Sequence, residues 1–173
     1  LWMWTADLFQ SMVYLEHMGV VHSDIKPANL LLTGPFSSPS VRLVVADFGV
    51  STIIKSDGFA ACNGGTREYR APECDNDRFT SRIDVWAAAA TVYEMWFGEP
   101  AVLHKHIRWK VSKKTGRVNC EFKPRRVIGE QPPSNLRSML SALFKPSPVR
   151  PRPMELGGEL AGWGCELIRE LVN

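Results

Sequence analysis

Residues 22–49 read HSDIKPANLLLTGPFSSPSVRLVVADFG, and they give the first indication of how this chain folds. Short apolar runs, Leu30–Leu32 and Val41–Val45, stand on either side of TGPFSSPS. The Gly, Pro and Ser residues of that segment are typical of a turn. Two short apolar runs around such a turn predict a small β-hairpin.

Three oxygen-bearing side chains stand beside the predicted strands, namely Asp24, Asn29 and Asp47. Because each lies on a turn next to a strand, their oxygens can converge on one point. Carboxylate and amide oxygens are ligands that Mg²⁺ accepts, and Mg²⁺ usually takes few carboxylates together with phosphate oxygens. Lys26 adds a point charge that can approach a phosphate. The spacing indicates a site for a metal–nucleotide complex, although Asp and Asn taken singly are also common turn residues.

Four segments combine helical spacing of apolar residues with helix start or stop residues: residues 5–18, 84–97, 134–144 and 159–172. The second is apolar on nearly every side and is followed by Gly98 and Pro100, so we expect a buried central helix there. The first is expected to begin at Thr5 as its N-cap and to end at Gly19. Residues 57–65 are rich in Gly, Ala and Asn and predict a surface loop.

The composition, with 45% apolar and 23% charged residues in a chain of 173, excludes disorder and suffices for one packed core. The longest apolar run, residues 85–93, is far shorter than the roughly 18 residues that cross a bilayer, so no membrane span is expected.

The chain starts at Leu1 without the features of a signal peptide, which predicts a piece of a longer protein. Four scattered cysteines with no CxxC pair disfavour zinc and disulfides and predict an intracellular location, cytoplasmic or nuclear.

The charge is distributed unevenly along the chain. The formal net charge of +3 is made of −5 over residues 1–100, +11 over residues 101–152 and −3 over residues 153–173. Residues 101–152, called the basic segment here, predict either an acidic or phosphorylated partner or a solvated surface. Trp109, Phe122 and Phe144 are its few aromatic residues, which argues against nucleic acid as the partner.

Further motifs follow the first segment in a fixed order. Residues 65–73 read GTREYRAPE, residues 84–86 read DVW, and Arg150 opens RPRPMEL. Together with HSDIKPAN and DFG, they resemble the catalytic loop, metal-binding loop and activation-segment end of eukaryotic serine/threonine protein kinases. A lone DFG is uninformative, but this ordered set is highly specific.

The resemblance implies a chemical role for six residues. Asp24 would accept or orient the proton of the substrate hydroxyl, and Lys26 would stabilise the transferring phosphoryl group. Asn29 and Asp47 would hold the Mg²⁺ ions that bridge the phosphates of ATP. Leu31 would form part of the floor beneath adenine. Thr66 would lie near the substrate, and, with Lys26, it matches the pattern of kinases that modify Ser or Thr of proteins.

Five further residues have structural roles by the same resemblance. His22 would pack among apolar residues, and Phe48 would belong to a spine of apolar residues whose packing sets the active or inactive geometry. Asp84 would cap its helix and hold the backbone of the catalytic loop. Glu73 would pair with Arg150.

The expected fold is mainly α: a protein kinase-like C-terminal lobe, with helices around a buried central helix and a small β-hairpin that carries the catalytic and metal loops. Residues 1–173 would form this lobe alone, since the chain has neither a GxGxxG pattern nor a VAIK-like lysine before residue 22. The expected function is transfer of the ATP γ-phosphate to a protein Ser or Thr hydroxyl, with an upstream lobe needed for full activity. The alternative is a truncated pseudokinase or scaffold that uses the lobe as a protein-binding surface.

Ser23 departs from the family pattern, because it replaces the arginine of HRD. In kinases that keep it, this arginine pairs with a phosphate on the activation segment. We therefore hypothesise that activity does not depend on phosphorylation of Ser51, Thr52 or Ser56, which are the nearby acceptors.

Overall fold

A computed structural model describes residues 1–35, 38, 40–61, 64–75, 78–100, 107–111, 118–122, 134–147 and 149–156. It contains the helices α1 (Trp2–His17), α2 (Arg82–Phe97) and α3 (Ser134–Leu143). Its strands are β1 (Val20–Val21), β2 (Leu30–Leu32), β3 (Leu43–Val45), β4 (Thr52–Ile53), β5 (Ile107–Val111) and β6 (Val118–Phe122). Short 3₁₀ helices are η1 (Pro27–Asn29), η2 (Arg67–Tyr69), η3 (Pro72–Asp75) and η4 (Pro153–Leu156).

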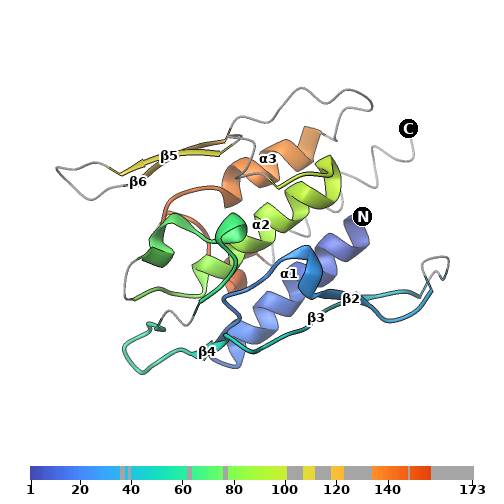
Figure 1. Cartoon of the computed structure of the whole chain (residues 1–173), viewed down its shortest axis with the longest axis horizontal. Helices are drawn as coiled ribbons and strands as arrows, with labels where there is room; N and C mark the ends of the chain where they lie inside the picture. Colours follow the sequence, from blue (N-terminus) through green and yellow to red (C-terminus); the bar gives the residue numbers. More distant parts are fainter. Residues whose placement is uncertain are drawn as a thin grey trace.

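Helix α2 is the centre of the core, as its sequence predicts. It lies between α1 and α3 (Figure 1), and every residue from Ile83 to Tyr93 is buried. Its alanines allow close approach of neighbours, and Trp86 contacts Phe144 edge-on with ring centroids 5.1 Å apart. The helix ends at Gly98, whose φ of 73° is the left-handed conformation that glycine adopts without penalty.

Two predicted helix starts are wrong by a few residues. Helix α1 begins at Trp2 instead of Thr5, and the Thr5 hydroxyl donates to the Leu1 carbonyl at 3.1 Å from within the first turn. A threonine can bond back to the preceding turn in this way, so it does not mark the helix start. Helix α2 begins at Arg82, two residues before Asp84, which lies in its first turn.

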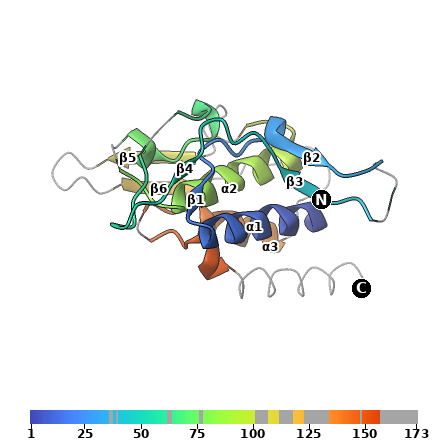
Figure 2. The same cartoon turned by 90° about the horizontal axis from the view of Figure 1, so that it is seen from below.

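The predicted β-hairpin is present. Strands β2 and β3 pair antiparallel, with Leu30 opposite Val45 and Leu32 opposite Leu43. The hairpin projects beyond the helices near the start of α1 (Figure 2). Its second strand begins at Leu43 and not at Val41, and the Arg42 side chain and the Leu43 amide donate hydrogen bonds to the carboxylate of Asp7 on α1.

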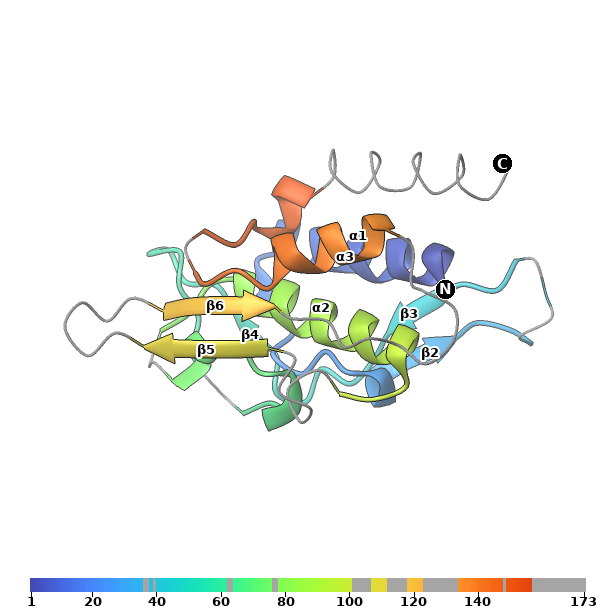
Figure 3. The ribbon, with the colours of Figure 1, turned by 90° about the horizontal axis from the view of Figure 1, so that it is seen from above.

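Two strand pairs were missed by the sequence reasoning. Strand β1 pairs with β4, which brings together the two ends of the segment that carries both the catalytic motif and DFG. Strands β5 and β6 pair antiparallel inside the basic segment (Figure 3), where no strand was predicted. The β1–β4 pairing depends on backbone hydrogen bonds between residues over 30 positions apart, which local apolar periodicity does not report.

Several predictions concern residues outside the described part of the chain. These are the helix over residues 159–172, most of the loops of the basic segment, and residues 62 and 63 of the predicted surface loop. Within the described residues, no helix combines the length and apolar character required to span a bilayer.

Arg150 joins the segment after α3 to the rest of the core. It is fully buried, and its Nη1 and Nη2 donate to the two carboxylate oxygens of Glu73 at 2.5 and 3.2 Å. Its Nε and Nη1 also donate to the carbonyls of Lys145 and Arg82 at 2.8 and 2.9 Å. The guanidinium carbon lies 4.8 Å from the centre of the Trp86 ring. Three chain segments therefore meet on one buried ion pair.

Candidate active site

The carboxylate of Asp84 binds the backbone of the loop that precedes β2. This carboxylate is 2% exposed and accepts hydrogen bonds from the backbone amides of His22 at 2.7 Å and Ser23 at 2.9 Å. Ser23 has a φ of 70°, a left-handed conformation that costs energy for a residue with a Cβ. The two bonds to Asp84 hold the loop in that conformation, which turns Asp24 away from the core.

His22 ties the same loop to the segment that carries Asp47. Its Nε2 donates to the Ala46 carbonyl at 3.1 Å, and its Nδ1 accepts from the Asp24 amide at 3.3 Å. One ring nitrogen donates and the other accepts, so the ring is neutral. Burial lowers the pKa of His22, against the charges of Asp24 and Asp47, which raise it. The ring thus links the Asp24 backbone to Ala46, the residue directly before Asp47.

Asp24 is the centre of a dense network. The amide and hydroxyl of Thr66 donate to its Oδ1 at 2.8 and 2.7 Å, and Lys26 Nζ donates to its Oδ2 at 2.8 Å. Lys26 also donates to Thr66 Oγ1 at 2.8 Å. Burial alone would raise the pKa of Asp24, but the hydrogen bonds from Lys26 and Thr66 together hold it below its usual value. Asp24 is therefore an ionised carboxylate at neutral pH.

Asn29 and Asp47 are brought to the same region by the hairpin. The Asn29 side-chain nitrogen donates to the carbonyl and Oδ2 of Asp24 at 2.9 and 3.2 Å, and its backbone carbonyl accepts from Ala46 at 2.9 Å. This leaves the amide oxygen of Asn29 available to a cation. Asp47 is exposed, with a φ of 65°, and its Oδ1 accepts from the Gly49 amide at 3.2 Å.

The donor set fits a magnesium–phosphate complex better than a closed metal site. No group of three or more His, Cys, Asp or Glu side chains suited to a metal occurs among the described residues. An amide oxygen from Asn29 and a carboxylate from Asp47 are the oxygen ligands expected when phosphates and water complete the coordination of Mg²⁺.

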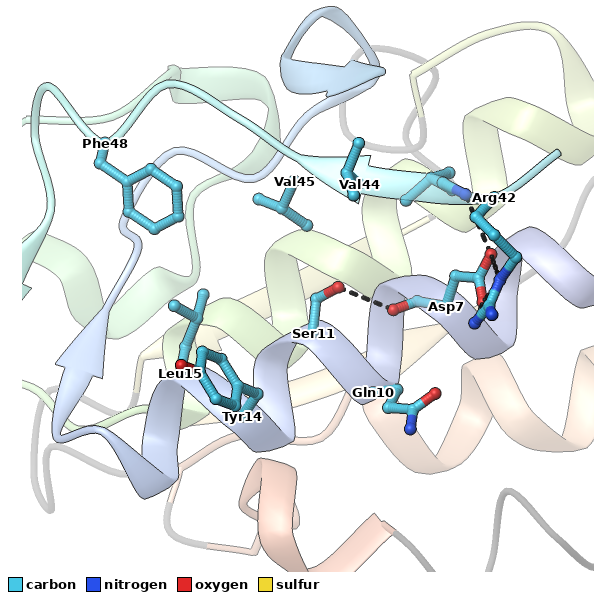
Figure 4. A pocket seen from close by; sticks show the side chains of 10 residues that line it. Asp7, Gln10, Ser11, Tyr14, Leu15, Arg42, Val44, Val45 and Phe48 are labelled. Atoms are coloured by element: carbon cyan, nitrogen blue, oxygen red, sulfur yellow. Dashed lines mark hydrogen bonds and ion pairs between the residues drawn. The ribbon is translucent and has the colours of Figure 1, made fainter. Parts of the chain in front are cut away.

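Leu31 and Phe48 lie away from this network. Both are exposed, at 54% and 50%, and the Phe48 ring lies 4.9 Å from that of His22. Phe48 also lines a cavity of about 540 Å³ between α1 and β3 (Figure 4). Exposed apolar side chains surround this cavity, including Tyr14 at 63% and Val44 at 42%. This cavity is thus distinct from the Asp24 network, and Phe48 lies at the border between the two.

Gly65 is a site residue that the sequence reasoning did not single out. Its φ is 104°, and a Cβ placed there would lie 2.4 Å from the backbone carbonyl oxygen of Ser23. Only glycine fits so close an approach of two backbones. The adjacent glycines at 64 and 65, directly before Thr66, were the signal that could have identified it.

If the full-length protein transfers phosphate as the resemblance implies, Gly65→Ala should lower that transfer about tenfold or more, because the new methyl group pushes Thr66 away from Asp24. Folding is expected to lose about 1–3 kcal/mol from backbone strain. Steady-state kinetics and thermal unfolding of the full-length protein measure both. Gly34→Ala is the matched control, since nothing lies within 4 Å of a Cβ there. Equal activity of the two variants would contradict the positioning role of Gly65.

Asp84 predicts a pH effect on stability. Burial raises its pKa to about 6, against the lowering hydrogen bonds from His22 and Ser23, and the charge of Glu16 raises it further. Between about pH 4 and pH 6 the folded chain keeps a proton that the unfolded chain has released. This group therefore makes the chain less stable as pH rises through that range, by at most about 3 kcal/mol in total.

The measurement is the free energy of unfolding in urea from pH 4 to 7, for the natural chain and for Asp84→Asn. The variant lacks the titrating group, so its stability should fall less over this range. Asp57→Asn, an exposed aspartate paired with Arg78, should leave the slope unchanged. Parallel curves for the natural chain and Asp84→Asn would reject the assignment.

The comparisons with known proteins agree with this geometry. The protein kinase domain family matches residues 2–154. A probable myosin light chain kinase of Dictyostelium discoideum is 36% identical over 110 residues, which cover 60% of this chain and 34% of that protein. The serine/threonine-protein kinase ATG1 of Debaryomyces hansenii is 28% identical over 160 residues, covering 83% and 18%. Calcium-dependent protein kinase 29 of Arabidopsis thaliana is 30% identical over 146 residues, covering 78% and 26%.

The chain spans about a third or less of the length of these relatives. The family match, in contrast, covers most of the chain, including the Asp24 network, the β2–β3 hairpin and Arg150. This chain belongs to the protein kinase domain family.

Proposed function

We propose that residues 1–173 are the C-terminal lobe of a serine/threonine protein kinase, which transfers the γ-phosphate of ATP to a Ser or Thr hydroxyl of a protein. The observation that carries this proposal is the ionised Asp24, held by Lys26 and Thr66, with Asn29 at its side. The name of the Debaryomyces hansenii relative, a serine/threonine-protein kinase, supports Ser and Thr as acceptors. An intracellular site of action, cytoplasmic or nuclear, belongs to the same proposal.

Asp24 orients the substrate hydroxyl and accepts its proton. Its carboxylate is fixed on both oxygens, so it cannot turn away from an incoming hydroxyl. Lys26 lies beside the path of the phosphoryl group, since its Nζ is already placed between Asp24 and Thr66. Preorganised charges of this kind act without reorganising during the reaction.

Asn29 and Asp47 would hold Mg²⁺ together with the phosphates of ATP. Bound Mg²⁺ supplies charge neutralisation on the phosphate oxygens. The chain contributes the fixed placement of these two ligands, since the backbone bond from Ala46 to Asn29 ties their loops together. Leu31, exposed on β2, would contact adenine.

An N-terminal lobe is proposed to complete the cleft. The exposed apolar residues Tyr14, Val44 and Phe48 around the cavity of Figure 4 suit a face that another part of the protein covers. In this proposal the glycine-rich loop and a phosphate-binding lysine belong to that lobe.

The test is an assay of the full-length protein with ATP radiolabelled at its γ-phosphate and a general protein substrate, followed by identification of the labelled amino acid. Label on Ser or Thr that requires Mg²⁺ supports the proposal. Absence of transfer, combined with no ATP binding by calorimetry, would favour a scaffold.

Regulation is proposed not to use a phosphate at the position of the family's HRD arginine, because the buried Ser23 carries no charge. Thr52→Glu and Ser56→Glu should therefore change activity of the full-length enzyme by less than about twofold. Ser51 is a poor choice for this test, since its hydroxyl donates to the His22 carbonyl at 3.1 Å. A large rise in activity of either glutamate variant would reject the hypothesis.

A further inference from the structure

An exposed arginine stands directly beside the network of Asp24. Thr66 is fixed to Asp24 by its amide at 2.8 Å and its hydroxyl at 2.7 Å. Arg67 follows it as the first residue of η2, so its Cα is about 3.8 Å from that of Thr66. The side chain of Arg67 is exposed.

The other cationic side chains of this region already bind groups of the same chain. Lys26 pairs with Asp24 at 2.8 Å, and Arg70 donates from Nη2 to the Cys74 carbonyl at 3.0 Å. Arg67, in contrast, has no ion pair with any residue in the part of the chain that the structure describes. Its charge is therefore open to a ligand.

Most of the neighbouring acidic side chains also have hydrogen-bond or ion-pair partners within the chain. Glu94 accepts a hydrogen bond from the Tyr69 hydroxyl at 2.5 Å, and Glu73 is paired with the buried Arg150. Glu68 follows Arg67 directly, and consecutive residues on a helical turn do not face one another. An external anion can thus reach Arg67 without displacing a bonded carboxylate of the chain.

We infer that Arg67 selects protein substrates that carry an anionic side chain, a carboxylate or a phosphate, within one or two residues of the acceptor hydroxyl. The inference rests on the proposed function. An extended peptide advances about 3.3–3.6 Å per residue, so a neighbour of a hydroxyl held at Asp24 lies close to Thr66 and Arg67. A guanidinium group binds carboxylate and phosphate alike through two parallel hydrogen bonds. Arg67 is in this sense a specificity residue that binds the substrate beside the reacting group.

The experiment uses the full-length enzyme and peptides with a single serine acceptor in a neutral background. The residues one and two positions before and after the serine are replaced in turn by Ala, Asp, Lys or phosphothreonine. We expect kcat/KM to be about tenfold higher for Asp than for Ala in at least one position, and lowest for Lys, because hydrogen bonds to charged groups contribute at this level. Comparison of the Asp and phosphothreonine peptides distinguishes a carboxylate from a phosphate as the preferred anion.

Arg67→Glu should reverse the ranking of Asp and Lys peptides, and Arg67→Lys should keep the ranking with a smaller ratio. Lys145→Glu is the matched control, because it makes the same charge change at another exposed cation, beyond α3. Circular dichroism and thermal unfolding check that the variants fold. If both Arg67 variants unfold, the natural enzyme is measured instead. The ratio of its kcat/KM for Asp peptides to that for Ala peptides should fall severalfold between about 0.05 and 0.5 M salt.

The outcomes distinguish the role of Arg67 in substrate selection from the proposed kinase activity. Transfer to peptides with no anionic preference, or an unchanged preference in Arg67→Glu, overturns the role of Arg67 while the kinase activity stands. A preference that does not respond to salt overturns it too. Failure to phosphorylate any peptide or protein overturns the proposed function, and the inference with it.

Discussion

Asp24→Asn in the full-length protein is expected to lower phosphate transfer by about 10²–10⁴-fold, the usual contribution of a positioned proton acceptor. The amide that replaces the carboxylate has no charge to attract the hydroxyl proton. Its nitrogen also meets the donor groups of Lys26 and Asn29 where an oxygen accepted their hydrogen bonds. The measurement is kcat with saturating Mg²⁺-ATP and a protein substrate.

ATP binding and folding should survive this change, because Asn29 and Asp47 are still present to hold the metal. Calorimetric titration with Mg²⁺-ATP should give a Kd within about threefold of the natural value, a free-energy change below about 1 kcal/mol. Asp57→Asn serves as the matched control, since Asp57 is a half-exposed aspartate in a surface ion pair with Arg78. Transfer that persists in Asp24→Asn would refute the role given to Asp24.

Arg150→Met is expected to have the largest effect on stability. It leaves Glu73 as a largely buried carboxylate without its partner, and it removes donors from the carbonyls of Lys145 and Arg82. Breaking one side of a buried ion pair typically costs about 3–5 kcal/mol, which is a large share of the stability of a single domain. Urea unfolding followed by circular dichroism measures the loss.

Two further variants make this prediction specific. Arg152→Met removes an exposed arginine that pairs with Glu155 at 3.0 Å, and it should cost less than about 1 kcal/mol. Combining Arg150→Met with Glu73→Leu should recover part of the loss, because no unpaired charge then stays buried. If Arg150→Met and Arg152→Met were equally mild, the ion pair would not be a main support of the core.

Local sequence predicted those features that depend on neighbouring residues. The apolar run from Val85 to Tyr93 specified the central helix, and Gly98 specified its end, because both signals act within a few residues. The turn between Leu30–Leu32 and Val41–Val45 specified the hairpin for the same reason. Thr5 misled the prediction of the helix start, since its hydroxyl bonds back within the helix.

Features built from distant segments could not be read in this way. Strand β1 pairs with a strand over 30 residues further on. Gly65 meets the carbonyl of Ser23 only because two loops cross. Glu16 likewise joins Ser81 and Met154, which are far from it in the sequence, through hydrogen bonds of 2.5 and 2.8 Å.

The sequence by itself predicted which residues would take part in phosphate transfer, because HSDIKPAN, DFG and GTREYRAPE resemble the motifs of protein kinases in their order. The tertiary structure decided how those residues are placed relative to one another. It placed both donors of Thr66 on Asp24, made the ring of His22 neutral, and left Arg67 exposed beside the network. The first two results depend on contacts between residues that lie more than 20 positions apart in the sequence, which local sequence patterns do not report.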